Sequence, residues 1–222
     1  MQGYLKYWDD LLARNPGLWI DSCASGGRRN DLDTMRRSVP LHYSDYGYGD
    51  HPVKLAFHDG LFNWLPYFKE SSLAWDVKGD SRFDHEVDRY AYHCGFGPMF
   101  FPTIDIRRDD YDYATSMEMI RIWQRAAPLM LDGDYYALSP VNRAPDKWVV
   151  RQFDRPETGE GFVQAIRLPA DQAQKLIVYP KALSKDTTYI FENPETGVKY
   201  GNIGVSNLPS YFFNFLWGCA VR

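Results

Sequence analysis

The sequence predicts an α/β fold in its first part and an antiparallel β-sheet in its second part. Up to about residue 133, short apolar segments typical of buried strands alternate with amphipathic segments typical of helices, which is the order found in parallel α/β folds. Beyond that point, strand-like segments follow one another with only turn signals between them. We therefore expect an α/β region over residues 1–135 and an antiparallel β-sheet or sandwich over residues 136–222.

The helices and strands of the first region are predicted from their apolar periodicity. Residues 2–15, for example, place apolar side chains on one helical face and end at Asn15-Pro16-Gly17, which stops a helix. Pro52 suits the first turn of a later helix, and residues 70–90 are too polar to assign. The expected order is helix 2–15, strand 18–23, short helix 29–37, strand 39–45, helix 53–68, a strand within 97–105, and helix 111–131.

The second region contains four predicted strands. Turn signals such as RPETGEG and NPETG separate them. The segments are KWVVRQF (147–153), GFVQAIRL (161–168), QKLIVYPK (174–181) and TTYIFEN (187–193).

The composition argues against several classes of protein. The net charge is −4 without a basic stripe or polybasic tract, so we expect neither nucleic acid nor a membrane as a partner. The first ten residues lack the pattern of a signal peptide, so a cytoplasmic location is the default expectation and the compartment is otherwise open. The three cysteines and five histidines show no disulfide framework and no metal-ligand spacing, so we expect no structural metal and no cofactor.

Candidate functional residues follow the first two predicted strands. Cys23, Gly26 and Gly27 come after the first strand, and Asp45 ends the second. In parallel α/β barrels the functional groups lie at the carboxyl ends of the strands. Glycines let the backbone approach a ligand, and a carboxylate at a strand end can transfer protons. The simpler alternative for the glycines is a tight turn without a ligand. The simpler alternative for Asp45 is a helix cap.

The combination of these residues is more specific than its parts. The segments DSCASGGRRNDL (21–32) and HYSD (42–45) resemble the glycoside hydrolase family 36 α-galactosidases. Further along, DRYAYHCGFGPMFFPTID (88–105) resembles the last barrel strand of that family, and GDYYALSP (133–140) resembles the segment that leads into its C-terminal β domain. The resemblance implies the later half of a (β/α) TIM-type barrel, followed by an antiparallel β domain.

The same resemblance implies a retaining hydrolase of carbohydrate metabolism that acts on terminal α-galactosides. Asp45 matches the general acid/base of the family. His42 stands where the family has tryptophan, so we expect a different subsite wall, and Ser25 and Arg28 replace glycines of the commonest form, so the sugar preference stays open. The residues expected to bind substrate are Cys23, Gly26, Gly27, His42, Tyr43 and Ser44, and those expected to support them are Asp21, Arg29 and Asp31.

The nucleophile of the family has no evident counterpart in this chain. In the family it is an aspartate in a Lys-x-Asp sequence at the end of an earlier strand. Lys6, Asp9 and Asp10 lie on the predicted first helix, too close to Cys23 to end a preceding barrel strand, so Asp21 and Asp105 are the conceivable local partners. Half a barrel exposes unpaired strand edges, so we expect a homo-oligomer in which two half barrels close on each other.

Two alternative functions stay open from the sequence. The missing nucleophile is compatible with a carbohydrate-binding or assembly module that does not hydrolyse its ligand. A different hydrolase chemistry, with Cys23 as nucleophile and His42 as the nearest candidate base, is a further possibility.

Overall fold

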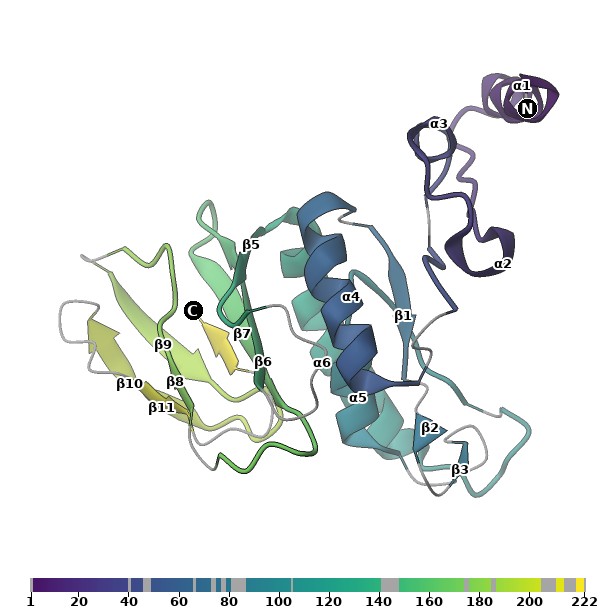
Figure 1. Ribbon diagram of the computed structural model, residues 1–222. Coiled ribbons are helices and arrows are strands. Elements are labelled where there is room, and N and C mark those ends of the chain that lie inside the picture. Colours follow the sequence, from purple (N-terminus) through teal and green to yellow (C-terminus); the bar gives the residue numbers. More distant parts are fainter. Residues whose placement is uncertain are drawn as a thin grey trace.

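The fold combines helices and strands (Figure 1). In the computed structural model, the segment carrying α1 to α3 projects away from a body formed by α4 to α6 and the strands (Figure 1). The structure describes residues 2–39, 41–45, 49–65, 67–72, 75–76, 79–80, 87–104, 106–140, 148–173, 176–184, 187–204, 211–213 and 219–221.

Four of the helices begin after an aspartate whose side chain caps them. The Asp50 carboxylate accepts a hydrogen bond from the amide of Val53 at the start of α4, and Asp112 accepts one from Thr115 at the start of α6. No helix in the described part of the chain is long and apolar enough to cross a membrane. The helices are α1 (Gln2–Arg14), α2 (Ala24–Gly27), α3 (Leu32–Met35), α4 (His51–Trp64), α5 (Arg89–Gly95) and α6 (Tyr113–Asp132).

These bounds agree with the predicted helices to within a few residues at most ends. The expected short helix at 29–37 is a single turn, α3, and the expected helix at 53–68 ends earlier, at Trp64. The unassigned segment 70–90 ends in the start of α5, which the sequence analysis did not predict.

Parallel pairing joins segments that follow one another along the chain. Strand β1 (Lys69–Ser71) pairs in parallel with β4 (Met99–Phe101). The amide of Lys69 donates to the carbonyl of Leu41 at 2.8 Å. Residue Asp21 forms a parallel bridge with Val39, flanked by two backbone hydrogen bonds of 2.9 and 3.0 Å.

The predictions of full strands at 18–23 and 39–45 are therefore wrong in extent. Only a single bridge between Asp21 and Val39 is present, although its parallel direction is the expected one. In the part of the chain that the structure describes, residues 20–22 have a hydrogen-bonded neighbour on one side only. This restricts their β-pairing to the single bridge. Two short strands, β2 (Trp75–Asp76) and β3 (Gly79–Asp80), form an antiparallel pair between β1 and α5.

The second part of the chain forms an antiparallel sheet, as the sequence predicts. Its strand order is β10-β9-β12-β7-β6-β5, and β8 pairs separately with β11. All four predicted strands are present, and strands at both ends of the region extend the sheet. The bounds are β5 (Asp134–Ala137), β6 (Trp148–Arg155), β7 (Glu160–Arg167), β8 (Leu176–Val178), β9 (Thr188–Glu192), β10 (Lys199–Gly204), β11 (Tyr211–Phe213) and β12 (Cys219–Val221).

The helices and the antiparallel sheet share one aromatic core. Phe62 of α4 stacks on Tyr135 of β5 and meets Phe153 of β6 edge-on, with ring centroids 4.7 Å apart in the second pair. Phe153 in turn stacks on Phe162 of β7. The antiparallel topology thus begins close to the expected boundary at 135/136, but the packing is continuous across it, and the division into two domains stays a prediction.

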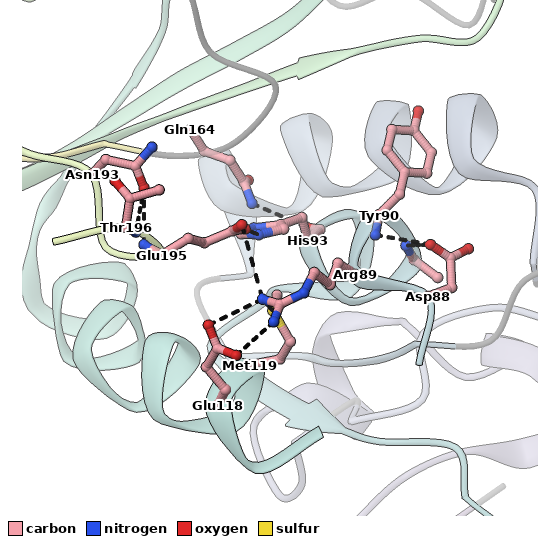
Figure 2. A network of polar contacts seen from close by, with 11 residues as sticks. Asp88, Arg89, Tyr90, His93, Glu118, Met119, Gln164, Asn193, Glu195 and Thr196 are labelled. Atoms are coloured by element: carbon pink, nitrogen blue, oxygen red, sulfur yellow. Dashed lines mark hydrogen bonds and ion pairs between the residues drawn. The ribbon is translucent and has the colours of Figure 1, made fainter. Parts of the chain in front are cut away.

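A polar network adds a second connection between the helices and the sheet (Figure 2). Arg89 of α5 pairs with Glu118 of α6 and lies 3.9 Å from Glu195 in the turn between β9 and β10. Glu195 also contacts the ring of His93, and the side-chain amide of Gln164 on β7 donates to the backbone carbonyl of His93 at 3.0 Å. The turn after β9 is thereby attached to α5, and through Arg89 to Glu118 of α6.

A buried carboxylate lies between the parallel strands and α4. Glu70 of β1 is 7% exposed and accepts hydrogen bonds from the Tyr43 hydroxyl (2.5 Å), the Ser71 amide (2.8 Å) and the His58 ring (3.3 Å). The Lys54 amine lies 3.8 Å from it and donates to the Ser71 carbonyl. These contacts connect the segment 41–45, helix α4 and β1 through one side chain.

The contacts explain why Glu70 stays ionised. Burial alone raises the pKa of this carboxyl, but the hydrogen bond from His58 and the charge of Lys54 outweigh burial and lower the pKa to about 2. Burial is also the largest influence on His58 and lowers its pKa to about 4. The ring is therefore neutral near pH 7 and can donate its Nε2–H to Glu70.

Substitution of Glu70 tests the importance of this cluster. We expect Glu70→Gln to lower the free energy of unfolding by roughly 3 kcal/mol, because the buried Lys54 amine loses its charged partner. The matched control is Glu118→Gln, since the pair of Glu118 with Arg89 is partly exposed and is worth about 1 kcal/mol or less. Urea denaturation of both variants measures the difference, and equal losses would contradict the assigned role of Glu70.

Candidate functional site

The turn formed by Gly26 and Gly27 packs directly on the backbone of Tyr43. Gly26 and Gly27 have φ of +72° and +79°, a conformation that side chains rarely adopt. A β-carbon on Gly27 would lie 1.6 Å from the Tyr43 carbonyl oxygen, so the two backbones touch. The Asn30 side chain donates to the same oxygen at 3.0 Å. The glycine pair therefore allows the turn to dock on the second segment.

Asp45 lies against this turn and beside His42. A β-carbon on Gly26 would lie 2.5 Å from Asp45 Oδ2, so the carboxylate occupies the space that the glycine leaves open. Asp45 Oδ1 is 2.6 Å from His42 Nε2. The Asp45 side chain is 71% exposed and accessible to a substrate. The structure thus brings Gly26, His42 and Asp45 together, as the sequence led us to expect.

The other residues predicted to bind substrate differ in how exposed they are. Cys23 is exposed and stands at the N-cap of α2, next to the glycine turn. Ser44 is half-buried. Tyr43 is buried and its hydroxyl donates to Glu70, so it supports the segment instead of presenting an exposed ring for a sugar.

The three residues predicted to support the site make different contacts. Asp31 caps α3 by accepting hydrogen bonds from the amide and hydroxyl of Thr34, and these bonds lower the pKa of its carboxyl. The Arg29 guanidinium lies 4.4 Å from the centroid of the Tyr4 ring on α1. Asp21 is exposed and forms the parallel bridge.

No second carboxylate is identified beside Asp45 in the part of the chain that the structure describes. Asp9 pairs with Arg37 and Asp10 with Lys6, as befits residues on the exposed side of α1. Asp105 lies outside the described residues. The same described part contains no group of three or more His, Cys, Asp or Glu side chains that could hold a metal ion.

The sequence did not predict the residues that hold Tyr43 in place, either directly or through Glu70. Glu70, Lys54 and His58 are polar side chains in segments that look exposed or unassignable in the sequence. Asn30 falls within the resemblance, but no sequence signal points to its bond with Tyr43.

A well-formed cavity lies away from this site. A hollow of about 400 Å³ lies between α6 and strands β7 and β9, with a mainly apolar lining that includes Phe96, Leu129 and Phe162. None of the predicted site residues lines it. The candidate site is instead an open rim, as the exposure of Asp45 shows.

Solved structures of α-galactosidases align with nearly the whole of this chain. The galactosidase domain of the α-galactosidase–sucrose kinase AgaSK aligns with a TM-score of 0.68 and 18% identity over 97% of this chain. The α-galactosidase of Lactobacillus brevis aligns with a TM-score of 0.71 and 17% identity over 97% of this chain. A variant of the family 36 α-galactosidase AgaA from Geobacillus stearothermophilus, in complex with stachyose, gives a TM-score of 0.72 and 18% identity over 98%.

These proteins define a glycosidase-like fold, and the chain spans about 30% of the length of each of them. At these identities the likeness is one of fold. The described structure corresponds to a C-terminal part of the family 36 α-galactosidase architecture, which confirms the predicted resemblance at that level. No protein-family model and no curated protein matches the sequence.

The docked turn gives a testable consequence for Gly27. We expect Gly27→Ala to destabilise the turn by about 2–5 kcal/mol, because strain at positive φ adds to a collision with a backbone oxygen. The control is Gly17→Ala, where φ is +87° and nothing lies within 4 Å, so only the strain of about 1–2 kcal/mol applies. Native-state hydrogen exchange of the amides around residues 22–31 measures the effect. Similar protection in both variants would show that the close approach is unimportant.

Proposed function

We propose that this chain is a glycoside hydrolase of α-galactosidase type, acting on terminal α-galactosides with Asp45 as general acid/base. The observation that carries the proposal is the exposed Asp45 carboxylate, which lies against Gly26 and beside His42 after a parallel segment. The likeness of the fold to family 36 α-galactosidases supports the substrate class.

The arrangement of the parallel segments supports a half barrel. Asp21 and Val39 form a parallel bridge, the Lys69 amide donates to the Leu41 carbonyl, and β1 pairs in parallel with β4, so these segments lie side by side in that order. A helix lies in every connection: α2 and α3 in the first, α4 in the second and α5 in the third. This is the repeating unit of a (β/α) barrel, and we assign these segments to its later half.

The proposed mechanism gives Asp45 two steps. As an acid it protonates the glycosidic oxygen while the bond from that oxygen to the anomeric carbon breaks, and as a base it accepts a proton from the water that completes hydrolysis. A retaining enzyme also needs a carboxylate nucleophile about 5–5.5 Å from the acid. We propose that this nucleophile comes from outside the described residues, from a second copy or from a further part of a longer polypeptide.

The face of the parallel segments opposite α4 is the expected place for such a partner. Because strand side chains alternate, Lys69 and Phe101 project away from the side on which Glu70 is buried, and the Lys69 amine lies 5.8 Å from the centroid of the Phe101 ring. Trp19, 67% exposed, meets Tyr67 edge-on. We infer that a second copy covers this aromatic face, because the proposed half barrel leaves its strand edges unpaired.

Assembly is measured by light scattering after size-exclusion chromatography. We expect the wild-type chain to form a dimer and Trp19→Glu to shift it toward monomer, because a charge on the covered face must be desolvated. Trp64→Glu is the control, since Trp64 is 85% exposed at the end of α4 and lies outside the proposed face. A soluble wild-type monomer, or equal effects of the two variants, would contradict this assembly.

Hydrolysis is tested with an aryl α-galactoside and the Asp45→Asn variant. Loss of the acid/base group should lower turnover by about 10²- to 10⁴-fold. Asp33→Asn, which changes another exposed carboxylate close by in the sequence, should keep wild-type activity. If Asp45→Asn were as active as wild type, Asp45 would have no part in the mechanism.

A carbohydrate-binding or assembly module without hydrolysis is the alternative proposal. It is favoured by the single carboxylate identified at the site in the described part of the chain. Galactose binding by calorimetry, together with no turnover of any aryl glycoside, would select it. The chemistry with Cys23 as nucleophile has less support, because the Nε2 atom of the candidate base His42 is engaged with Asp45.

A further inference from the structure

We propose that His42 is the positioning residue for Asp45 and determines which carboxylate oxygen carries the transferable proton. The inference rests on the function proposed above and adds the group that orients its acid/base residue. The family pattern has tryptophan at this place, so the arrangement follows from this chain's own residues.

The Asp45 carboxylate is constrained on two sides. Oδ1 lies 2.6 Å from His42 Nε2, within hydrogen-bonding distance. Oδ2 lies over Gly26, at 2.5 Å from the place where a β-carbon would stand. His42 is the better covered partner, with 22% of its side chain exposed against 71% for Asp45. One oxygen is thus bound to the ring, and the other faces the glycine turn.

The backbone keeps the two side chains in this relation. Tyr43, which follows His42 directly, is fixed at both ends: its hydroxyl donates to Glu70, and its carbonyl accepts from Asn30. The same carbonyl lies against Gly27. The segment that carries His42 and Asp45 is therefore attached to the buried cluster on one side and to the turn on the other.

The division of roles between the two oxygens follows from elementary acid chemistry. A carboxyl group that acts as an acid carries its proton on one oxygen. When His42 Nε2–H donates to Oδ1, the transferable proton resides on Oδ2, beside Gly26 and Gly27. Transfer to a leaving oxygen bound over the turn leaves a carboxylate, and the hydrogen bond from His42 strengthens because its acceptor becomes charged. His42 contributes by orienting and stabilising Asp45 and does not exchange a proton with the substrate.

Nitrogen NMR of the histidine rings tests the pairing without any need for turnover. In the full chain, labelled with ¹⁵N-histidine, Asp45→Asn should shift the ring nitrogens of His42 more than those of the other four histidines. The resonances are assigned with His42→Gln. Asp10→Asn is the control, since that carboxylate pairs with Lys6 on α1. If His42 shows no response to Asp45→Asn, or an equal response to both variants, the inference is overturned.

Kinetics with an aryl α-galactoside test the positioning role. His42→Ala should lower kcat by about 10- to 100-fold, the cost of a misplaced catalytic group, with KM within about twofold of wild type. His42→Gln keeps an N–H donor and should recover most of the loss, and thermal melts by circular dichroism establish that both variants are folded. Wild-type kcat in folded His42→Ala would overturn the inference. Absence of turnover in the wild type would instead overturn the proposed function, and the NMR result alone then decides whether His42 orients Asp45.

Discussion

The buried Glu70 carboxylate is the interaction on which the arrangement of the site depends. It receives hydrogen bonds from a tyrosine of the segment before Asp45, from a histidine of α4 and from the backbone of its own strand. A carboxylate in such a place costs several kcal/mol of desolvation unless donors surround it. The donors come from three different elements, so these elements can approach only in the one register that satisfies the charge. The position of Asp45 thus depends on contacts that its neighbour Tyr43 makes with the buried Glu70.

The buried contacts of Tyr43 explain how the exposed Asp45 side chain can have a fixed position. Asp45 has most of its side chain in solvent, and solvent-exposed side chains usually lose little by moving. Its neighbour Tyr43 is buried and bonded at both ends, however, and the glycine turn leaves space for the carboxylate where any side chain would collide with it. The buried contacts of Tyr43 therefore hold the segment while the Asp45 carboxylate stays open to solvent, and the proposed proton transfer to a sugar would need both.

The sequence predicted the parts of the molecule whose signals are local. Helical periodicity gave α1, α4 and α6, and apolar segments between turn signals gave the central strands of the antiparallel sheet. The proximity of the glycine turn to Asp45 was expected only through the resemblance, because spacing alone does not show that two segment ends are adjacent. Glu70, Lys54 and His58 could not have been found in this way. A charged residue is buried when partners far away in sequence surround it, and neither periodicity nor composition records those partners.

The structure also separates two requirements that are usually met within a single barrel. Positioning an acid needs only a strand end, a turn and a buried anchor, and this chain contains all three within residues 21–71. Double displacement needs a second carboxylate on another strand end, at a distance set by the closure of the whole barrel. The proposed half barrel would satisfy the first requirement alone, because the Glu70 cluster joins the segment 41–45, α4 and β1 and needs no further strand. If the proposed half barrel closes on a second copy, the exposed face with Trp19 and Phe101 is where it would do so, and the same contact would have to supply the second carboxylate.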